Sequence, residues 1–151
     1  MLTIDLIAIQ SNWLALQKIG AGAGVAGVIK ANAYGLGAEN VGNALYQVGC
    51  REFFFASINE ALAAKKYLPY ASLIYLLGGV TKGDEITIIR AGIIPVLCSV
   101  QSINDWADAK IALDSDAPCA IKINTGMTRF GVDVGEFEQL CANSKLLHIV
   151  N

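Results

Sequence analysis

Short apolar runs alternate with amphipathic segments along almost the whole chain, and this alternation limits the folds that the chain can adopt. The apolar runs are typical of buried strands, whereas the segments between them repeat apolar residues every three or four positions, as helices do. Strands that alternate with helices indicate βαβ units around a parallel sheet. Because proline donates no hydrogen bond, Pro95 is expected to weaken the first half of one strand. We predict strands in a segment ending near Lys30 and over residues 51–57, 72–77, 93–99, 119–123 and 146–150.

The predicted helices lie between these strands, and two of them carry motifs for a first turn. Ser57 and Glu60 form a capping box, which predicts a helix that continues to about Lys66. Asp133 and Glu136 are expected to cap a later helix. The other predicted positions are Leu6, Ile9, Trp13 and Leu16 on a first helix; Val41, Ala44, Leu45 and Val48 on a helix that ends at Gly49; the segment Thr81–Ala91; Ile103, Trp106, Lys110 and Leu113, with Trp106 and Leu113 in the core; and Phe137, Leu140 and Cys141, packed on the last helix.

Two parallel architectures fit this pattern, and the pattern alone does not choose between them. A doubly wound open sheet is complete with five or six strands in roughly this length. A (β/α)8 barrel of the TIM type needs eight strands and about 250 residues, so this chain would be a barrel truncated at about six strands. With 151 residues, either alternative corresponds to a single domain.

The composition excludes several classes of function. Hydrophobic residues make up 54% of the chain and charged residues only 16%, which suits strands buried on both faces of a sheet. The formal net charge of -2 offers no basic excess for nucleic acid or an anionic membrane. No apolar run reaches the roughly 18 residues of a membrane helix, and Asp5 argues against a signal peptide. We therefore expect a soluble, cytoplasmic protein without nucleic-acid or membrane partners.

The cysteines predict neither a disulfide framework nor a metal centre. They are widely spaced and form no CxxC pair. Reduced, packed thiols of a cytosolic protein are the expected state, and no metal site is predicted. The four residues are Cys50, Cys98, Cys119 and Cys141.

A glycine-rich segment, Gly22–Gly27, matches the GxGxxG pattern of dinucleotide-binding proteins. In such a site the glycines follow a strand and open a helix, so that the pyrophosphate meets the helix N-terminus. Here they follow a predicted helix and lead into a predicted strand, and no acidic residue ends a strand about 20 positions later. The segment is therefore interpreted as a flexible connection.

Three cationic residues follow the predicted strands. In a barrel, the chemistry gathers at the C-terminal ends of the strands. Lys30 is expected to close the first strand, Lys122 lies near the end of the fifth, and Arg129 lies in the loop that follows. We predict that these three side chains emerge on one rim, where they either form a site or are three solvated cations.

The segments VIKANAYGLG (28–37) and KINTGMTRFGV (122–132) contain these cations, and together they resemble the alanine racemase family. The stretches IDL with Asn12, ASINEAL and LLGG match that family too, so the resemblance extends from end to end. It implies an eight-stranded barrel followed by a mostly β C-terminal domain. Residues 1–151 would then be the N-terminal part of the barrel that binds pyridoxal 5'-phosphate. The implied reaction interconverts L-alanine and D-alanine for peptidoglycan precursor supply, in a homodimer.

The resemblance implies roles for two residues of the first motif. Lys30 would be the catalytic lysine that holds pyridoxal phosphate as a Schiff base and then acts as a base beside the substrate Cα. Such an amine must be neutral to react, which a desolvating pocket favours. Tyr34 would lie beside the cofactor phosphate; otherwise it is an aromatic residue of the core or rim.

In the second motif, Arg129 would bind the phenolic oxygen of the cofactor and contribute to substrate binding, since a guanidinium keeps its protons and offers several donors. Lys122 corresponds to a lysine that is often carbamylated, and a carbamate would be an anion able to hold Arg129. Asn124 and Thr128 depart from the family, which more often has Asp and Gly there. His148 matches no motif.

The resemblance also implies that some parts of the active site are not supplied by residues 1–151. The second acid/base would be a tyrosine from the C-terminal domain of the other subunit, and the main phosphate-binding loop would lie in later strands. We therefore expect this chain alone to be inactive. Other interpretations are a pyridoxal-phosphate carrier or homeostasis barrel that does not racemise, an amino-acid racemase of broader specificity, and a non-catalytic scaffold that retains the motifs.

Overall fold

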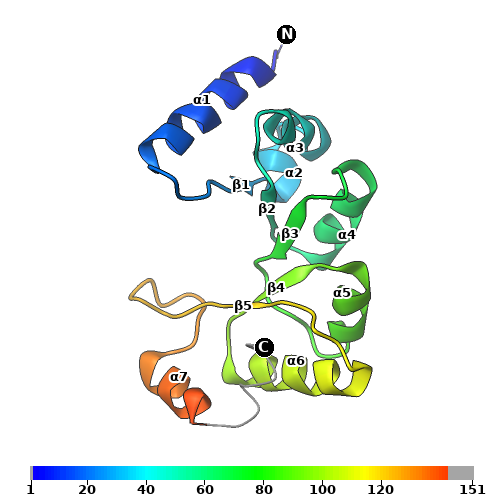
Figure 1. Cartoon of the computed structure of the whole chain (residues 1–151), viewed down its shortest axis with the longest axis vertical. Coiled ribbons are helices and arrows are strands. Elements are labelled where there is room, and N and C mark those ends of the chain that lie inside the picture. Colours follow the sequence, from blue (N-terminus) through cyan, green and yellow to red (C-terminus); the bar gives the residue numbers. More distant parts are fainter. Residues whose placement is uncertain (1, 143–151) are drawn as a thin grey trace. The chain divides into compact units, whose positions relative to one another are not determined.

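The computed structural model describes residues 2–142 (Figure 1). The predicted strand 146–150 and His148 lie outside the described residues. The chain forms two compact units, Met1–Tyr75 and Leu76–Asn151, and each is considered by itself.

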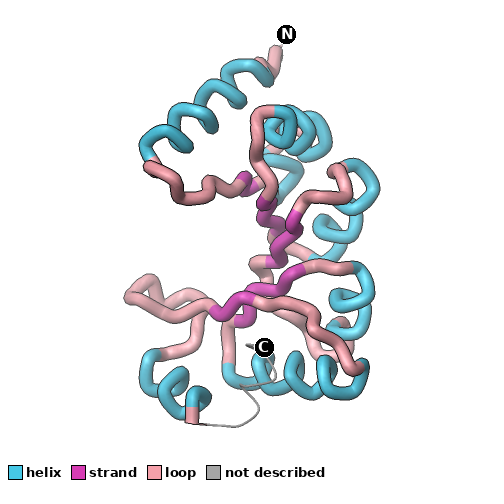
Figure 2. The backbone as a smooth tube through the Cα atoms, viewed as in Figure 1, coloured by secondary structure: helices cyan, strands magenta, loops and turns pink. Residues whose placement is uncertain are grey.

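The first unit alternates helices with short strands, as the sequence predicts (Figure 2). Its strands lie side by side in the order β1-β2-β3. β1 and β2 run parallel, with Gly27 opposite Phe53 and Val28 opposite Phe54. The elements are α1 (Leu6–Ile19), β1 (Gly27–Val28), α2 (Lys30–Tyr34), α3 (Ala38–Gln47), β2 (Glu52–Phe55), α4 (Ile58–Tyr67) and β3 (Leu73–Leu76), the last of which spans the boundary between the units.

Alternate side chains of β2 point to opposite faces of the sheet, and the two faces differ in burial. Phe53 and Phe55 are fully buried in the core. Phe54, between them, is half-buried and stacks on Tyr75 of β3, with ring centroids 4.5 Å apart. A Cβ on Gly27 would come within 3.2 Å of the Phe53 ring, so the absence of a side chain lets β1 pack closely here.

Helix α1 forms where predicted, but its apolar residues do not all enter the core. Trp13 is the buried residue of this helix, and its indole N–H donates to the carbonyl of Val25 at 3.0 Å. Leu16 is 56% exposed, and Leu6 and Ile9 are only half-buried. Periodicity therefore identified the helix correctly but overestimated its buried face.

The second unit has two parallel strands, with Val96 opposite Ala120 and Leu97 opposite Ile121. Its core contains Leu97, Ile103 and Trp106, each almost fully buried. Leu113, predicted to be in the core, is half-buried, whereas Lys110 is 4% exposed. The elements are α5 (Glu85–Ala91), β4 (Ile94–Leu97), α6 (Val100–Leu113), β5 (Ala120–Ile121) and α7 (Val134–Cys141).

Pro95 lies inside β4 and is buried; the ladder to β5 pairs Val96 and Leu97, in agreement with the expected weakening of the first half of this strand. Two other predictions about this unit were wrong in detail. The helix expected from Thr81 begins only at Glu85, because Gly83 at φ +102° is not helical. On α7, Leu140 is buried as predicted, but Phe137 is half-buried and Cys141 exposed.

Residues 22–26 lie between α1 and β1 and Gly27 begins β1, which confirms that this glycine-rich segment follows a helix and leads into a strand. All four cysteines are free, although only Cys50 is buried. Within residues 2–142, no helix is both long and apolar enough to cross a membrane.

Substituting Trp13→Ala should lower the free energy of unfolding by about 3–5 kcal/mol, the range for removing a large buried aromatic side chain. The change also removes the indole hydrogen bond to the Val25 carbonyl. Leu16→Ala is the matched control on the same helix, and we expect a change within about 0.5 kcal/mol. Urea denaturation followed by circular dichroism measures both; equal losses would contradict the burial seen here.

Candidate active site

Lys30 lies at the end of the first strand, as predicted, and is the first residue of α2. The pairing with β2 extends one residue past β1, since the Ile29 N–H donates to the Phe54 carbonyl at 3.1 Å. Lys30 is therefore the first residue beyond the sheet, at the C-terminal end of the strand. In α/β proteins, this is the end at which binding and catalytic groups collect.

The chain then makes a left-handed turn, which the sequence analysis did not predict. Ala31, Asn32, Ala33 and Tyr34 all have positive φ, between 50° and 55°. For residues with a Cβ, this conformation costs roughly 1–2 kcal/mol each, and usually only single residues adopt it. A turn of four such residues needs other interactions to hold it in place.

Hydrogen bonds hold this turn at both ends. The Ala31 N–H donates to Oε1 of Glu60 at 2.7 Å. The side-chain oxygen of Asn32 accepts from the N–H of Ala38, the first residue of α3, at 2.8 Å. Gly35 and Gly37, both at positive φ, then return the chain to α3. The KANAYG motif thus forms a fixed turn between β1 and α3.

The turn brings Tyr34 close to Lys30. The Nζ atom of Lys30 lies 5.9 Å from the centroid of the Tyr34 ring, within the range of a cation–π contact. Lys30 is half-buried and Tyr34 is 65% exposed, so the first unit does not enclose either side chain. In the part of the chain that the structure describes, the Lys30 amine has no carboxylate partner.

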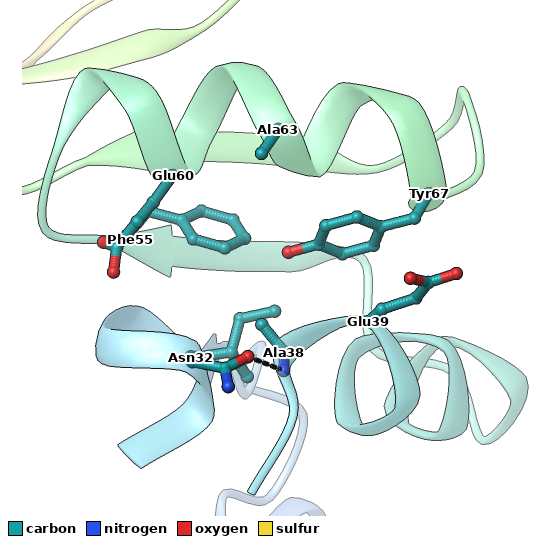
Figure 3. Close-up of a pocket in the computed structure, with 8 residues that line it drawn as sticks. Asn32, Ala38, Glu39, Phe55, Glu60, Ala63 and Tyr67 are labelled. Atoms are coloured by element: carbon teal, nitrogen blue, oxygen red, sulfur yellow. Dashed lines mark hydrogen bonds between the residues drawn. The ribbon is translucent and has the colours of Figure 1, made fainter. Parts of the chain in front are cut away.

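A pocket of about 290 Å³ lies between the turn and α4 (Figure 3). Its lining includes Asn32 and Glu60, the two side chains that hold the turn. The Tyr67 ring projects into it from α4, and burial, followed by the charges of Glu39 and Glu60, raises the pKa of this phenol. The remaining lining residues are Ile29, Ala38, Phe55 and Ala63.

Lys122 lies directly after β5 and is half-buried, as its position at a strand end predicts. Its N–H donates to the Leu97 carbonyl at 2.9 Å, and its own carbonyl accepts from the Val132 N–H at 2.8 Å. Burial raises the pKa of the Cys98 thiol, and the charge of Lys122 opposes that shift. Arg129 lies in the following loop, and its side chain is exposed.

Asn124 organises the loop that carries Arg129. Its side-chain oxygen accepts from the N–H groups of Gly126 at 3.2 Å and Thr128 at 3.1 Å. Its amide nitrogen donates to Oδ1 of Asp133 at 2.9 Å. Thr128 adopts φ 52°, which is unfavourable for a β-branched residue. The Asn124 side chain therefore accepts hydrogen bonds from the loop, as the carboxylate of an aspartate could. It also donates a hydrogen bond to Asp133, which an ionised carboxylate could not do.

The structure therefore brings Lys30 and Tyr34 together in the first unit. Lys122 and Arg129 both belong to the second unit, one directly after β5 and the other in the loop that follows. The shared rim stays a prediction, since each unit is described by itself. The residues that sequence reasoning missed are Glu60 and Asn32 as supports of the turn. No group of three or more metal-ligating side chains occurs in the range 2–142.

Strands followed by helices, with an amine directly after the first strand, define an α/β protein whose candidate site lies at the strand ends. Comparison with known proteins narrows this class. Residues 4–150 match the family model of the alanine racemase N-terminal domain. This chain belongs to the alanine racemase family.

Individual relatives agree with this assignment. The chain is 41% identical over 147 residues to alanine racemase of Brucella ovis, covering 97% of this chain and 37% of that protein. It is 43% identical over 148 residues to alanine racemase of Rhodospirillum rubrum, covering 97% of this chain and 40% of that protein. The chain thus spans about two fifths of the length of these relatives.

A solved structure shows the same fold. Alanine racemase from Bartonella henselae, which contains covalently bound pyridoxal phosphate, superposes with a TM-score of 0.92 at 39% identity. The match covers 97% of this chain and 43% of that one. The barrel prediction is therefore confirmed as the incomplete barrel of this family, and the doubly wound alternative is wrong.

Replacing Asn124 with Asp should destabilise the second unit at neutral pH by about 1 kcal/mol, because a hydrogen bond is lost and a second carboxylate faces Asp133. Repulsion raises the pKa of this carboxylate pair above the unfolded value, so the stability deficit should shrink as pH falls through the raised pKa. Denaturation at pH 7.5 and pH 4.5 measures the change. The double variant N124D/D133N exchanges donor and acceptor and should recover most of the loss; a pH-independent deficit would contradict the interpretation.

Proposed function

We propose that this chain is the N-terminal, cofactor-binding part of a pyridoxal-phosphate-dependent alanine racemase. Its reaction is the interconversion of L-alanine and D-alanine for peptidoglycan precursor supply, in the cytoplasm. The observation that carries the proposal is the position of Lys30: a half-buried amine directly after the first strand, on a turn held from both sides. Family membership and the covalently bound cofactor of the Bartonella henselae relative support it.

The described residues suit this cofactor chemically. The Lys30 amine is partly accessible and has no carboxylate partner within residues 2–142, so an aldehyde can reach it. When bound, pyridoxal phosphate supplies the electron sink that makes the α-proton of an amino acid removable. Lys30 would bind the cofactor and move that proton, and Tyr34, 5.9 Å from its Nζ, would lie beside the phosphate. Arg129 would hold the cofactor and substrate, supported by Lys122.

We propose further that the complete protein contains the remaining barrel strands and a C-terminal domain, and that it acts as a homodimer. The chain covers 37% to 43% of the lengths of the relatives compared above. Residues 1–151 would then hold one face of the substrate site, and the opposite face would come from the later segments of a partner subunit. On this proposal, residues 1–151 alone do not turn over alanine.

The first test is a spectral titration with pyridoxal phosphate, followed by borohydride reduction and peptide mapping. We expect covalent label at Lys30, and the substitution Lys30→Ala should abolish it because Lys30 is the amine that follows β1 on the held turn. Lys18→Ala, which removes a lysine from the last turn of α1, is the control and should leave the label unchanged. Label scattered over several lysines in equal amounts would contradict the assigned role of Lys30.

Lys122 provides a separate test, because we propose that its amine is carbamylated. Carbon dioxide reacts with the neutral amine, and Lys122 is half-buried directly after β5. With ¹³C-labelled bicarbonate, we expect one carbamate signal in the ¹³C NMR spectrum. The signal should vanish in Lys122→Ala and persist in Lys82→Ala, a control at an exposed lysine. A spectrum without a carbamate signal would show an ordinary ammonium and refute this part of the proposal.

A further inference from the structure

We infer that Glu60 is a positioning residue for Lys30: its carboxylate fixes the peptide group that follows Lys30 and thereby the direction of the lysine side chain. The effect of Glu60 on catalysis rests on the proposed function of Lys30, whereas the hydrogen bond from Ala31 to Glu60 is independent of that function. Glu60 belongs to α4, and the Ala31 N–H that it binds is 29 residues away in the sequence. The capping box that Glu60 forms with Ser57 explains the start of α4 but does not by itself connect Glu60 with Lys30.

The two oxygens of Glu60 serve different segments. Oε1 accepts from the Ala31 N–H at 2.7 Å. Oε2 accepts from the N–H groups of Ala56 at 2.9 Å and Ser57 at 3.3 Å, at the junction between β2 and α4. Hydrogen bonds to an ionised carboxylate are shorter and stronger than neutral ones. Glu60 therefore ties the segment after β1 to the segment after β2, the neighbouring strand.

The bond to Ala31 controls Lys30 because of peptide geometry. The Ala31 N–H and the Lys30 carbonyl belong to one planar group, so holding the N–H fixes the rotation of the backbone at Lys30. The next four residues adopt positive φ, a conformation they would leave without support. Glu60 holds the first N–H of this turn, and Asn32 holds the other end through Ala38.

A carboxylate suits this position better than an amide would. Three N–H donors converge on Glu60, and an ionised carboxylate only accepts. Glutamine has a single acceptor oxygen, and its NH₂ group would face an N–H on one side. In Glu60→Gln the single oxygen keeps two bonds if it faces Ala56 and Ser57 but only one if it faces Ala31, so we expect the NH₂ group to face the Ala31 N–H, while the size of the side chain stays the same.

An alternative is that Glu60 only caps α4 and that the contact with Ala31 has no consequence. Ser57 separates the two possibilities, because its hydroxyl accepts from the Glu60 N–H in the same capping box but does not touch Ala31. Ser57→Ala weakens the cap and leaves the carboxylate in place. Glu39→Gln is the matched charge control, since Glu39 lines the same pocket and is exposed.

The experiment measures amide hydrogen exchange by NMR on the full chain, without cofactor. In Glu60→Gln, exchange at Ala31 should accelerate about ten- to hundredfold, as expected for losing a hydrogen bond to a charged group. Ser57→Ala and Glu39→Gln should leave Ala31 at the wild-type rate.

A second readout follows Lys30 itself, by pyridoxal phosphate and borohydride labelling across pH. Glu60→Gln should reduce the label at Lys30 several-fold, and both controls should label like the wild type. The inference is overturned if Ala31 exchange is unchanged in Glu60→Gln, or if Ser57→Ala reproduces its effects. If wild-type Lys30 takes no label, the proposed function fails, and the exchange rates at Ala31 still decide whether Glu60 fixes the turn.

Discussion

Burial of alternate side chains along β2 is the constraint on which the first unit depends. Phe53 and Phe55 are removed from water on one face, while Phe54 stacks on Tyr75 on the other. A shift of one residue in the strand would exchange these faces. The register of β1 on β2 follows from the same packing, since Gly27 lies against Phe53. Once this register is fixed, Lys30 must fall directly beyond the sheet.

The candidate site depends on what happens in the few residues after each strand. After β1, a left-handed turn is held by Glu60 and Asn32; after β5, a loop is held by Asn124 and Asp133. Polar side chains therefore stabilise the backbone beside each proposed cationic residue. Such support is what a reacting amine requires, since small displacements of a catalytic group reduce its rate strongly.

Much of the fold could be predicted from local patterns. The capping boxes at Ser57 and Asp133, the first five predicted strands and their alternation with helices are confirmed. The errors concern residues whose environment is set by distant segments. Leu16 has helical periodicity but is 56% exposed, and Leu113, expected in the core, is half-buried.

The sequence by itself determined the family, the positions of Lys30 and Lys122 after strands, and the capping role of Glu60, because each depends on residues a few positions apart. Tertiary structure alone decided that Glu60 also binds Ala31, that four residues after Lys30 turn left-handed, and that Asn124 donates to Asp133. The physical reason is that a local pattern specifies periodicity and caps. An acceptor 29 residues away becomes available only when the strands pair and bring their ends together.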